Sequence, residues 1–126
     1  DSMMSLTTTS VRKEVAVAFS NGHFEKAFSH LSENIVWNVI GENTFKGKVE
    51  VISNCEQTTN YFNSVQTIFK TEDVIVSAKK VVVRGSAEFI KEGKQLSFIS
   101  ACDVYEFNDK NKIDRIQSYC IPIKSK

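Results

Sequence analysis

Apolar residues recur with a helical period in the first half of the chain and with a period of two in the second half. Ser10 is suited to cap a helix, and Gly22 is suited to end one. Between them, apolar residues at helical spacing predict a first helix: Val11, Val15, Ala18 and Phe19. A second, shorter helix is predicted where the spacing i, i+3, i+4, i+7 recurs at Phe24, Ala27, Phe28 and Leu31.

The rest of the chain predicts strands, interrupted by one further helix. Residues 35–40 are rich in β-branched residues around Trp37 and predict a strand, followed by a polar loop over 41–47. Residues 48–62 predict a third helix. The face of this helix that would pack inward is unusually polar for a core helix, as if it faced a cavity. Alternating residues then predict four strands, with a hairpin at Glu92-Gly93 and a polar turn over 108–112. These strands are expected near residues 67–77, 81–91, 95–107 and 113–121.

This order predicts an α+β fold with three N-terminal helices packed on one face of an antiparallel sheet. In the strand over 95–107, however, both faces are apolar. One face carries Ile99, Ala101, Tyr105 and Phe107, and the other carries Leu96, Phe98, Cys102 and Val104. We expect a homodimer through the second face of the sheet. A sheet that curls over itself is the alternative.

Chain length and charge narrow the classes of protein to consider. The chain has 126 residues, which is typical of one domain. Its net charge of +1 argues against a basic surface that binds nucleic acid. We expect that domain to cover residues 9–122, with a short tail over 123–126. Residues 1–8 are interpreted as a disordered N-terminus or a remnant of an expression vector.

The cysteines, the histidines and the lack of long apolar runs exclude several kinds of site and location. Three cysteines without CxxC spacing indicate reduced, structural thiols. His23 and His30 have no nearby partners that would complete a ligand set, so we expect no metal site. No segment has the length of a membrane span or a signal peptide, so we expect a cytoplasmic protein that does not bind membranes.

Several short segments, which together span most of residues 9–122, resemble one known superfamily. They are residues 21–28, 35–41, 45–47, 102–107 and 112–119. The chain resembles the nuclear-transport-factor-2-like (NTF2-like) superfamily, and within it the SnoaL-like polyketide cyclases and ketosteroid isomerases. The resemblance implies a cone-shaped, cystatin-like domain in which a strongly curved sheet wraps around a helix and encloses a deep pocket. It also implies frequent dimerisation through the sheet.

Asp103 is the residue with the clearest chemical potential. It shares a strand face with apolar residues, and an apolar setting disfavours the ionised form of a carboxyl. The resemblance places it at the oxyanion-hole aspartate of the isomerases, where a neutral carboxylic acid donates a hydrogen bond. The alternative is a carboxylate at the end of the sheet, paired with a lysine or with water.

Two other positions depart from the isomerase pattern. Asn38 stands where the resemblance implies the general-base aspartate, and an amide cannot take a proton at neutral pH. Val15 lies near the position of the isomerase tyrosine and cannot donate a hydrogen bond. Asn38 could orient a water or a carbonyl, as an asparagine does in the related epoxide hydrolases, or it could be a polar residue bonded to backbone. Those enzymes also have an aspartate where this chain has Ser118.

Two functions are compatible with these residues. The first is a pocket that binds a small, mostly apolar molecule, with cofactor-free acid–base chemistry on a carbonyl or enol compound through Asp103 and Asn38. The reaction would be an isomerisation, a cyclisation or a dehydration. The second is a non-catalytic, dimeric association or ligand-sensing module of the same fold. The expected pocket wall comprises Val15, Phe19, Cys55, Thr59, Phe62, Ala87, Phe89, Ile99, Ala101, Ile116, Ser118 and Cys120.

Overall fold

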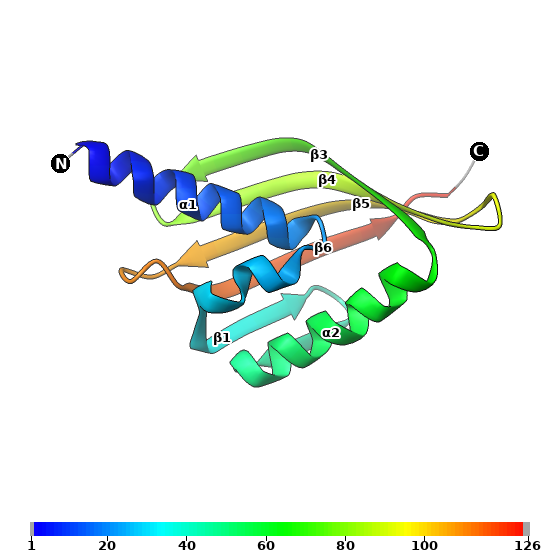
Figure 1. Cartoon of the computed structure of the whole chain (residues 1–126), viewed down its shortest axis with the longest axis horizontal. Coiled ribbons are helices and arrows are strands. Elements are labelled where there is room, and N and C mark those ends of the chain that lie inside the picture. The colour runs from blue at the N-terminus through cyan, green and yellow to red at the C-terminus, as the bar shows by residue number, and fades with distance from the viewer. Residues whose placement is uncertain (1, 125–126) are drawn as a thin grey trace.

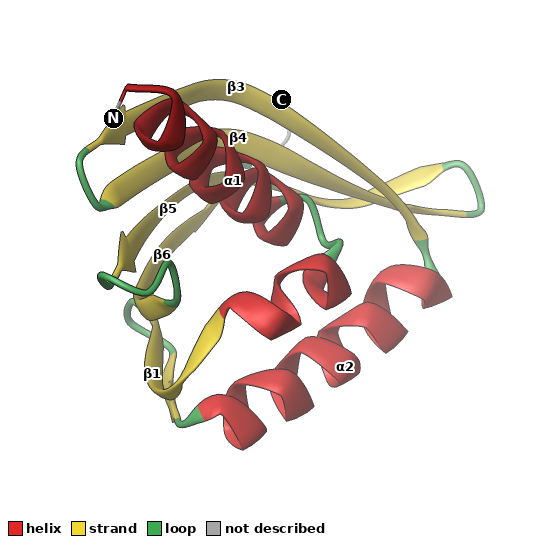
Figure 2. Cartoon of the chain, turned by 60° about the vertical axis from the view of Figure 1, so that its left-hand side comes forward, coloured by secondary structure: helices red, strands yellow, loops and turns green. Residues whose placement is uncertain are grey.

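The computed structural model describes residues 2–124, and the side chains from residue 7 onward. The chain forms six strands with the bounds β1 Leu31–Val39, β2 Asn43–Lys46, β3 Gln66–Ser77, β4 Lys80–Lys91, β5 Lys94–Phe107 and β6 Ile113–Pro122. They form one sheet in the order β2-β1-β6-β5-β4-β3. Figures 1 and 2 show this sheet curving around the first helix.

Three helices cover the concave face of the sheet (Figure 2). Helix α1 (Ser2–Ser20) packs on β3, β4 and β5, and a 3₁₀ helix η1 (Phe24–His30) follows it directly. Helix α2 (Lys48–Ser64) packs on β1, β2 and the start of β3. The space between these helices and the concave face holds both the core and the candidate site.

The structure confirms the α+β class and the four strands predicted for the second half of the chain. The expected hairpin is also present, because Glu92 and Gly93 connect β4 to β5 with φ angles of +53° and +77°. Positive φ at both central residues is the geometry that matches the twist of paired strands.

All three predicted helices are present, but only two of them precede every strand. Two helices, α1 and η1, precede the sheet, whereas α2 follows β1 and β2. The second helix is a 3₁₀ helix. The spacing of its apolar residues at i, i+3 and i+4 does not distinguish the two helix types, because it fits a short segment of either one. Helix α1 begins at Ser2 and includes Ser10, so Ser10 does not cap it.

The sheet also differs from the expected antiparallel one. The predicted polar loop over 41–47 contains β2, a short strand that pairs antiparallel with β1. β1 begins at Leu31, four residues before the predicted start, and pairs parallel with β6. Short strands with one apolar residue, such as Phe45 in β2, produce too little alternation to be recognised.

The termini are described only in part. Asp1, Ser125 and Lys126, which the sequence analysis assigns to the terminal segments, lie outside the described residues. The domain limits at residues 9 and 122 stay a prediction. None of the helices in the described part of the chain combines the length and hydrophobicity needed to cross a bilayer.

Gly85 lies at an irregularity in the pairing of β3 with β4. The β3–β4 register shifts between Thr71 and Asp73, opposite Gly85 and Arg84. A Cβ atom at Gly85 would lie 2.2 Å from the backbone oxygen of Lys70, so only glycine permits this close approach of the two strands. Such irregularities increase the local bend and twist of a sheet.

The outer face of the sheet carries exposed apolar side chains. Leu96 on β5 is 52% exposed, and Ile121 and Tyr119 on β6 are 59% and 41% exposed. Phe98, Cys102 and Val104 on β5 are half-buried on the same face. The helices cover only the opposite, concave face.

Candidate functional site

A cavity of about 500 Å³ lies between the helices and the concave face of the sheet, and we call it the main cavity. Its floor is formed by β4, β5 and β6, and its other walls by the end of α1, the start of η1, the β1–β2 hairpin, α2 and β3. Most of the wall is apolar, which is typical of a site for a small organic ligand. The charged residues in the lining are Glu42, Lys70 and Asp103.

Asp103 projects into this cavity from β5. Its neighbours across the sheet are Val83 on β4 and Ser118 on β6. Ser20, in the last turn of α1, donates a hydrogen bond to Asp103 Oδ2 at 2.7 Å. The hydroxyl of Ser118 also bonds to the carboxyl of Asp103. Two hydroxyl groups, from α1 and β6, therefore converge on one carboxyl.

Each of these two hydroxyl groups also accepts a hydrogen bond from another side chain. The indole Nε1–H of Trp37 can only donate, and it lies 2.9 Å from Ser118 Oγ. Ser118 therefore accepts from Trp37 and keeps its own proton for Asp103. Ser20 Oγ lies 2.6 Å from the hydroxyl oxygen of Tyr105. Since Ser20 gives its single proton to Asp103, Tyr105 donates to Ser20.

Burial governs the protonation of Asp103. Desolvation raises the pKa of its carboxyl, and the hydrogen bonds from Ser118 and Ser20 oppose that rise. The ion pairs found among the described residues all lie elsewhere on the surface. Tyr105 is fully buried, and desolvation together with nearby Asp103 raises the pKa of its hydroxyl well above the usual value. Tyr105 is thus a neutral donor, whereas Asp103 is able to exchange a proton.

Aromatic rings form much of the cavity wall. Phe19 packs edge-on against Phe24 and Trp37, at 4.8 and 5.1 Å between ring centroids. Phe62 from α2 packs against Phe89 and Phe69, at 5.6 and 5.1 Å. Rings held in this way give a rigid apolar surface, which suits a flat or cyclic ligand.

The cysteines are protonated thiols. Burial raises the pKa of Cys55 to about 12 and that of Cys120 to about 11, and Asp103 contributes to the second shift. The pKa of Cys102 is also raised, chiefly by burial. Because the thiolate is the nucleophilic form, none of the three is activated for covalent catalysis at neutral pH.

The structure brings nine of the predicted site residues together around the main cavity. They are Phe19, Phe62, Ala87, Phe89, Ile99, Ala101, Asp103, Ser118 and Cys120. Seven of the nine lie on β4, β5 and β6, where alternation places them on one face, whereas Phe19 and Phe62 come from α1 and α2. The period of two in the sequence is therefore sufficient to select this part of the wall.

The structure places the other five predicted residues outside the cavity lining. Val15, Cys55 and Ile116 are buried in the hydrophobic core. Thr59 faces a separate surface hollow beside the main cavity. Asn38 lies on the outer side of β1, where its side-chain oxygen accepts a hydrogen bond from Thr44 at 3.2 Å. Asn38 alternates with Trp37, which takes the cavity side instead.

Three residues of the Asp103 hydrogen-bond cluster were not selected from the sequence. Tyr105 follows Asp103 by two residues on the same strand face, and this parity was a usable signal. Trp37, which lies in the strand predicted over residues 35–40, lines the cavity and donates to Ser118. Ser20 contacts Asp103 across 83 positions of sequence, so no local pattern identifies it.

The described residues contain no group of three or more His, Cys, Asp or Glu side chains that could hold a metal ion.

Comparisons with known proteins identify the family. The model of the SnoaL-like domain matches residues 11–116. A solved NTF2-like protein of unknown function from Cytophaga hutchinsonii is 30% identical, with a TM-score of 0.83 over 90% of this chain and 99% of that one. A search of the curated proteins finds no match.

More distant structures share the fold. An LEH-like epoxide hydrolase from M. tuberculosis is 16% identical, with a TM-score of 0.67 over 89% of this chain and 84% of that chain. A candidate SnoaL-like polyketide cyclase from Jannaschia sp. CCS1 is 9% identical, with a TM-score of 0.70 over 89% and 86%. The match over residues 11–116 and the 30% identical relative together show that this chain belongs to the SnoaL-like domain family of NTF2-like proteins.

Proposed function

We propose that the protein catalyses a cofactor-free proton transfer on a small, mostly apolar carbonyl or enol compound, with Asp103 as the group that takes and returns the proton. The observation that carries this proposal is the convergence of Ser20 and Ser118 on a desolvated carboxyl inside an apolar cavity. Fold relatives described as polyketide cyclases and epoxide hydrolases support a pocket that performs chemistry on small molecules.

The hydrogen bonds of Asp103 suit both halves of such a transfer. In its ionised form the carboxylate accepts hydrogen bonds from Ser20 and Ser118 and has lone pairs left for the cavity. It removes a proton from a carbon next to the carbonyl, and the ligand becomes an enolate. The carboxylic acid so formed then returns the proton to another atom of the same ligand. Burial raises the pKa of Asp103 and so makes its carboxylate a stronger base in the first half.

This role differs from the purely hydrogen-bonding role expected for Asp103 from the isomerase resemblance. The isomerase base is missing, because position 38 carries an amide that faces away from the cavity. Asp103 is the acidic side chain with hydrogen bonds from two converging hydroxyls in the described lining, so it is the residue suited to act as the base.

Deuterium exchange into an apolar ketone tests the proposal without knowledge of the natural substrate. The probe is 2-tetralone, a bicyclic ketone whose acidic hydrogens can be followed by NMR in heavy water. We expect the protein to accelerate exchange and Asp103→Asn to lower that rate at least about a hundredfold. Asp114→Asn is the matched control, since Asp114 is exposed on β6 and bonds to Asn108. Equal rates for Asp103→Asn and the unmodified protein would refute the role of Asp103.

A non-catalytic ligand-sensing module of the same fold is the second candidate. The observation that favours it is the absence of the two other isomerase groups, since Asn38 faces outward and Val15 is buried in the core. The same probe separates the two functions. A sensing module binds 2-tetralone, as measured by the fluorescence of Trp37 in the cavity wall, without accelerating exchange.

A further inference from the structure

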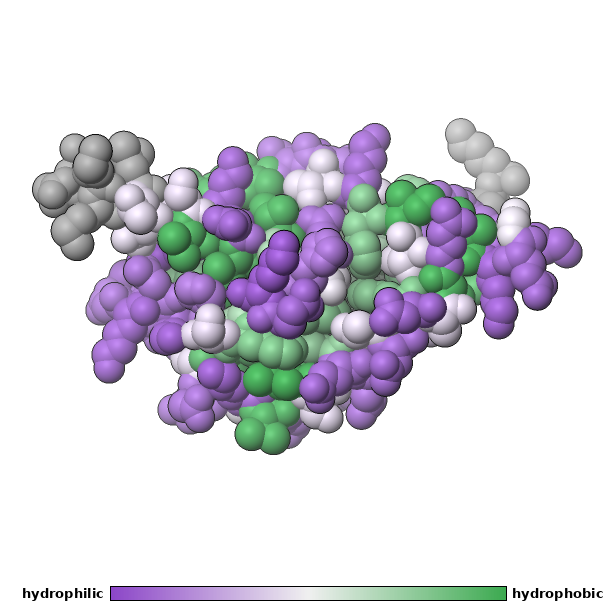
Figure 3. All heavy atoms as spheres, in the orientation of Figure 1, coloured by the Kyte–Doolittle hydropathy of each residue, from purple (hydrophilic) through white to green (hydrophobic). Residues whose placement is uncertain are grey.

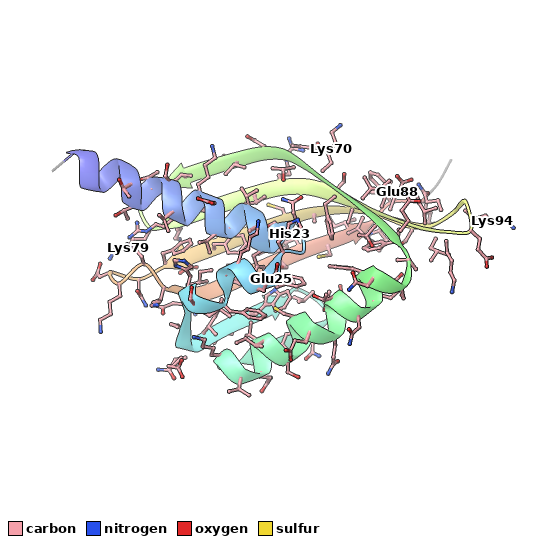
Figure 4. The ribbon with its side chains drawn as sticks, in the orientation of Figure 1. His23, Glu25, Lys70, Lys79, Glu88 and Lys94 are labelled. Carbon is pink, nitrogen blue, oxygen red and sulfur yellow. The ribbon has the colours of Figure 1, made fainter. Side chains whose placement is uncertain are left out.

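A second hollow, of about 870 Å³, lies on the surface next to the main cavity, and we call it the outer hollow. It is formed by the end of α1, the start of η1, the end of α2 and the start of β3. His23 and Glu25 lie at its rim, in front of the junction of α1 and η1 in Figure 4. Figure 3 shows hydrophilic side chains across this part of the surface.

Four residues line both spaces and separate them: Asn21, Gly22, Phe62 and Phe69. We call these four the partition. The rings of Phe62 and Phe69 meet edge to face, with their centroids 5.1 Å apart. Both residues are only half-buried, which fits rings with a space on either side.

Gly22 closes the partition from the opposite side. A Cβ atom at this position would lie 3.0 Å from the ring of Phe69 and 3.3 Å from that of Phe62. The φ angle of Gly22 is +82°, a conformation that side chains of L-residues rarely adopt. The backbone of Gly22 therefore lies directly against the two rings.

Hydrogen bonds keep the partition in place. Asn21 Nδ2 donates to the oxygen of Val17 and to Thr71 Oγ1, both at 2.8 Å, which ties the end of α1 to β3. Thr67 Oγ1 donates to the oxygen of Phe62 at 2.9 Å, which ties the end of α2 to β3. Three elements are thus fastened around the two rings.

The partition lies close to the Asp103 cluster. Gly22 follows Ser20 by two residues, and Ser20 donates to Asp103 at 2.7 Å. When the polar head of a ligand contacts Asp103, any part of that ligand that extends toward α2 therefore reaches the partition. Beyond it the outer hollow offers uncharged polar side chains, including Thr59, Asn63 and Thr67.

We infer that Phe62 and Phe69 set the maximum length of the ligand, and that the outer hollow becomes an extension of the site when either ring is removed. This inference rests on the proposed function, because Asp103 must bind the polar head. The accepted class is a compact compound with a hydroxyl or enol head and an apolar body.

A series of 4-alkylphenols with increasing chain length tests the inference on the complete chain. The phenol hydroxyl donates to Asp103, and Trp37 fluorescence reports binding. Each methylene that enters the cavity tightens binding about fourfold, and the gain stops where the chain reaches the partition. In Phe62→Ala, we expect the gain to continue for at least two further methylenes. Phe69→Ala gives a second opening of the same wall if Phe62→Ala folds poorly.

Tyr61→Ala is the matched control, because Tyr61 packs against Phe62 at 6.3 Å but lines neither space. Its length limit should equal that of the unmodified protein. An unchanged limit in both Phe62→Ala and Phe69→Ala, with phenols still bound, would overturn the inference and leave the proposed function standing. Failure of the unmodified protein to bind any phenol would overturn the inference, whereas exchange into 2-tetralone decides the proposed function separately.

Discussion

At the scale of single residues, the site depends on the proton balance around Asp103. Trp37 and Ser118 are both buried, as is Tyr105 on the other side of the carboxyl. Only one arrangement of the hydrogen bonds gives an acceptor to each of the donors around Asp103. In that arrangement the carboxylate of Asp103 accepts hydrogen bonds and donates none. Protonation of Asp103 places a proton that must either point into the cavity or reverse the Ser20–Tyr105 chain, because the indole of Trp37 cannot accept a hydrogen bond from Ser118.

This arrangement predicts a pH-dependent stability. Burial raises the pKa of Asp103 in the folded state, so the folded protein binds its proton more tightly than the unfolded chain. The stabilisation is complete below the ordinary aspartate value of about 3.9 and is lost as the pH rises through the higher folded-state pKa. We expect the free energy of unfolding, measured in urea, to fall over that range relative to the Asp103→Asn variant. A constant difference between the two proteins at every pH would contradict the shift.

The bond between Trp37 and Ser118 gives a second prediction. Ser118→Ala leaves the buried Nε1–H of Trp37 without its acceptor, at a cost of about 1–3 kcal/mol in the free energy of unfolding. Trp37→Phe in the same chain removes the orphaned donor, so the double variant should lose less than the sum of the two single variants. Additive losses in urea denaturation would indicate that the bond contributes nothing.

The residues of the site differ in how far the sequence predicts them. Asp103, Ser118 and Ala101 follow from alternation along single strands, which is a local property. Ser20 and Trp37 reach the site from elements far along the chain, through contacts of 83 and 81 positions to Asp103 and Ser118. Asn38 was selected because its position matches a family pattern, but one step along a strand moves a side chain to the other face.

At the scale of elements, the long strands were predictable and the short segments were not. β3 to β6 each have ten or more residues, so the alternation of apolar and polar residues in them is long enough to be recognised. η1 has seven residues and β2 has four, and their types are set by packing rather than by their own patterns. The parallel pairing of β1 with β6 is likewise a property of the whole sheet.

The irregularity at Gly85 predicts a large effect from a small substitution. Gly85→Ala places a Cβ atom 2.2 Å from a backbone oxygen of β3, which cannot move without displacing the strand. We expect a loss of roughly 3 kcal/mol or more in the free energy of unfolding. Gly41→Ala is the control, because Gly41 has a φ angle of +78° and open space around its Cα. It should cost only about 1–2 kcal/mol from backbone strain.

At the scale of the whole molecule, the outer face of the sheet lacks a cover in the described chain. Its exposed side chains include Leu96, Tyr119 and Ile121, on strands whose other face is covered by the helices. Exposed apolar residues grouped on one face are typical of an interaction surface. We propose that a second copy of the chain packs against this face.

Light scattering during size-exclusion chromatography tests the dimer. We expect a dimer at micromolar concentration, and Ile121→Lys should convert it to a monomer by burying an unpaired charge. Val49→Lys is the control, since Val49 is 85% exposed on α2, away from the sheet. A monomeric unmodified protein would exclude the proposed interface.

The position of β6 has a consequence for how the molecule folds. β6 lies between β1 and β5 in the sheet, although it follows the other described elements along the chain. The β1–β2 pair can therefore join the rest of the sheet only after β6 has formed. β6 also completes the hydrogen-bond network of Asp103 through Ser118. Pairings between such distant segments are slow to form because the intervening chain must first be ordered. Acquisition of the site is therefore expected to coincide with the final, rate-limiting step of folding, so that partly folded chains do not yet present it to ligands.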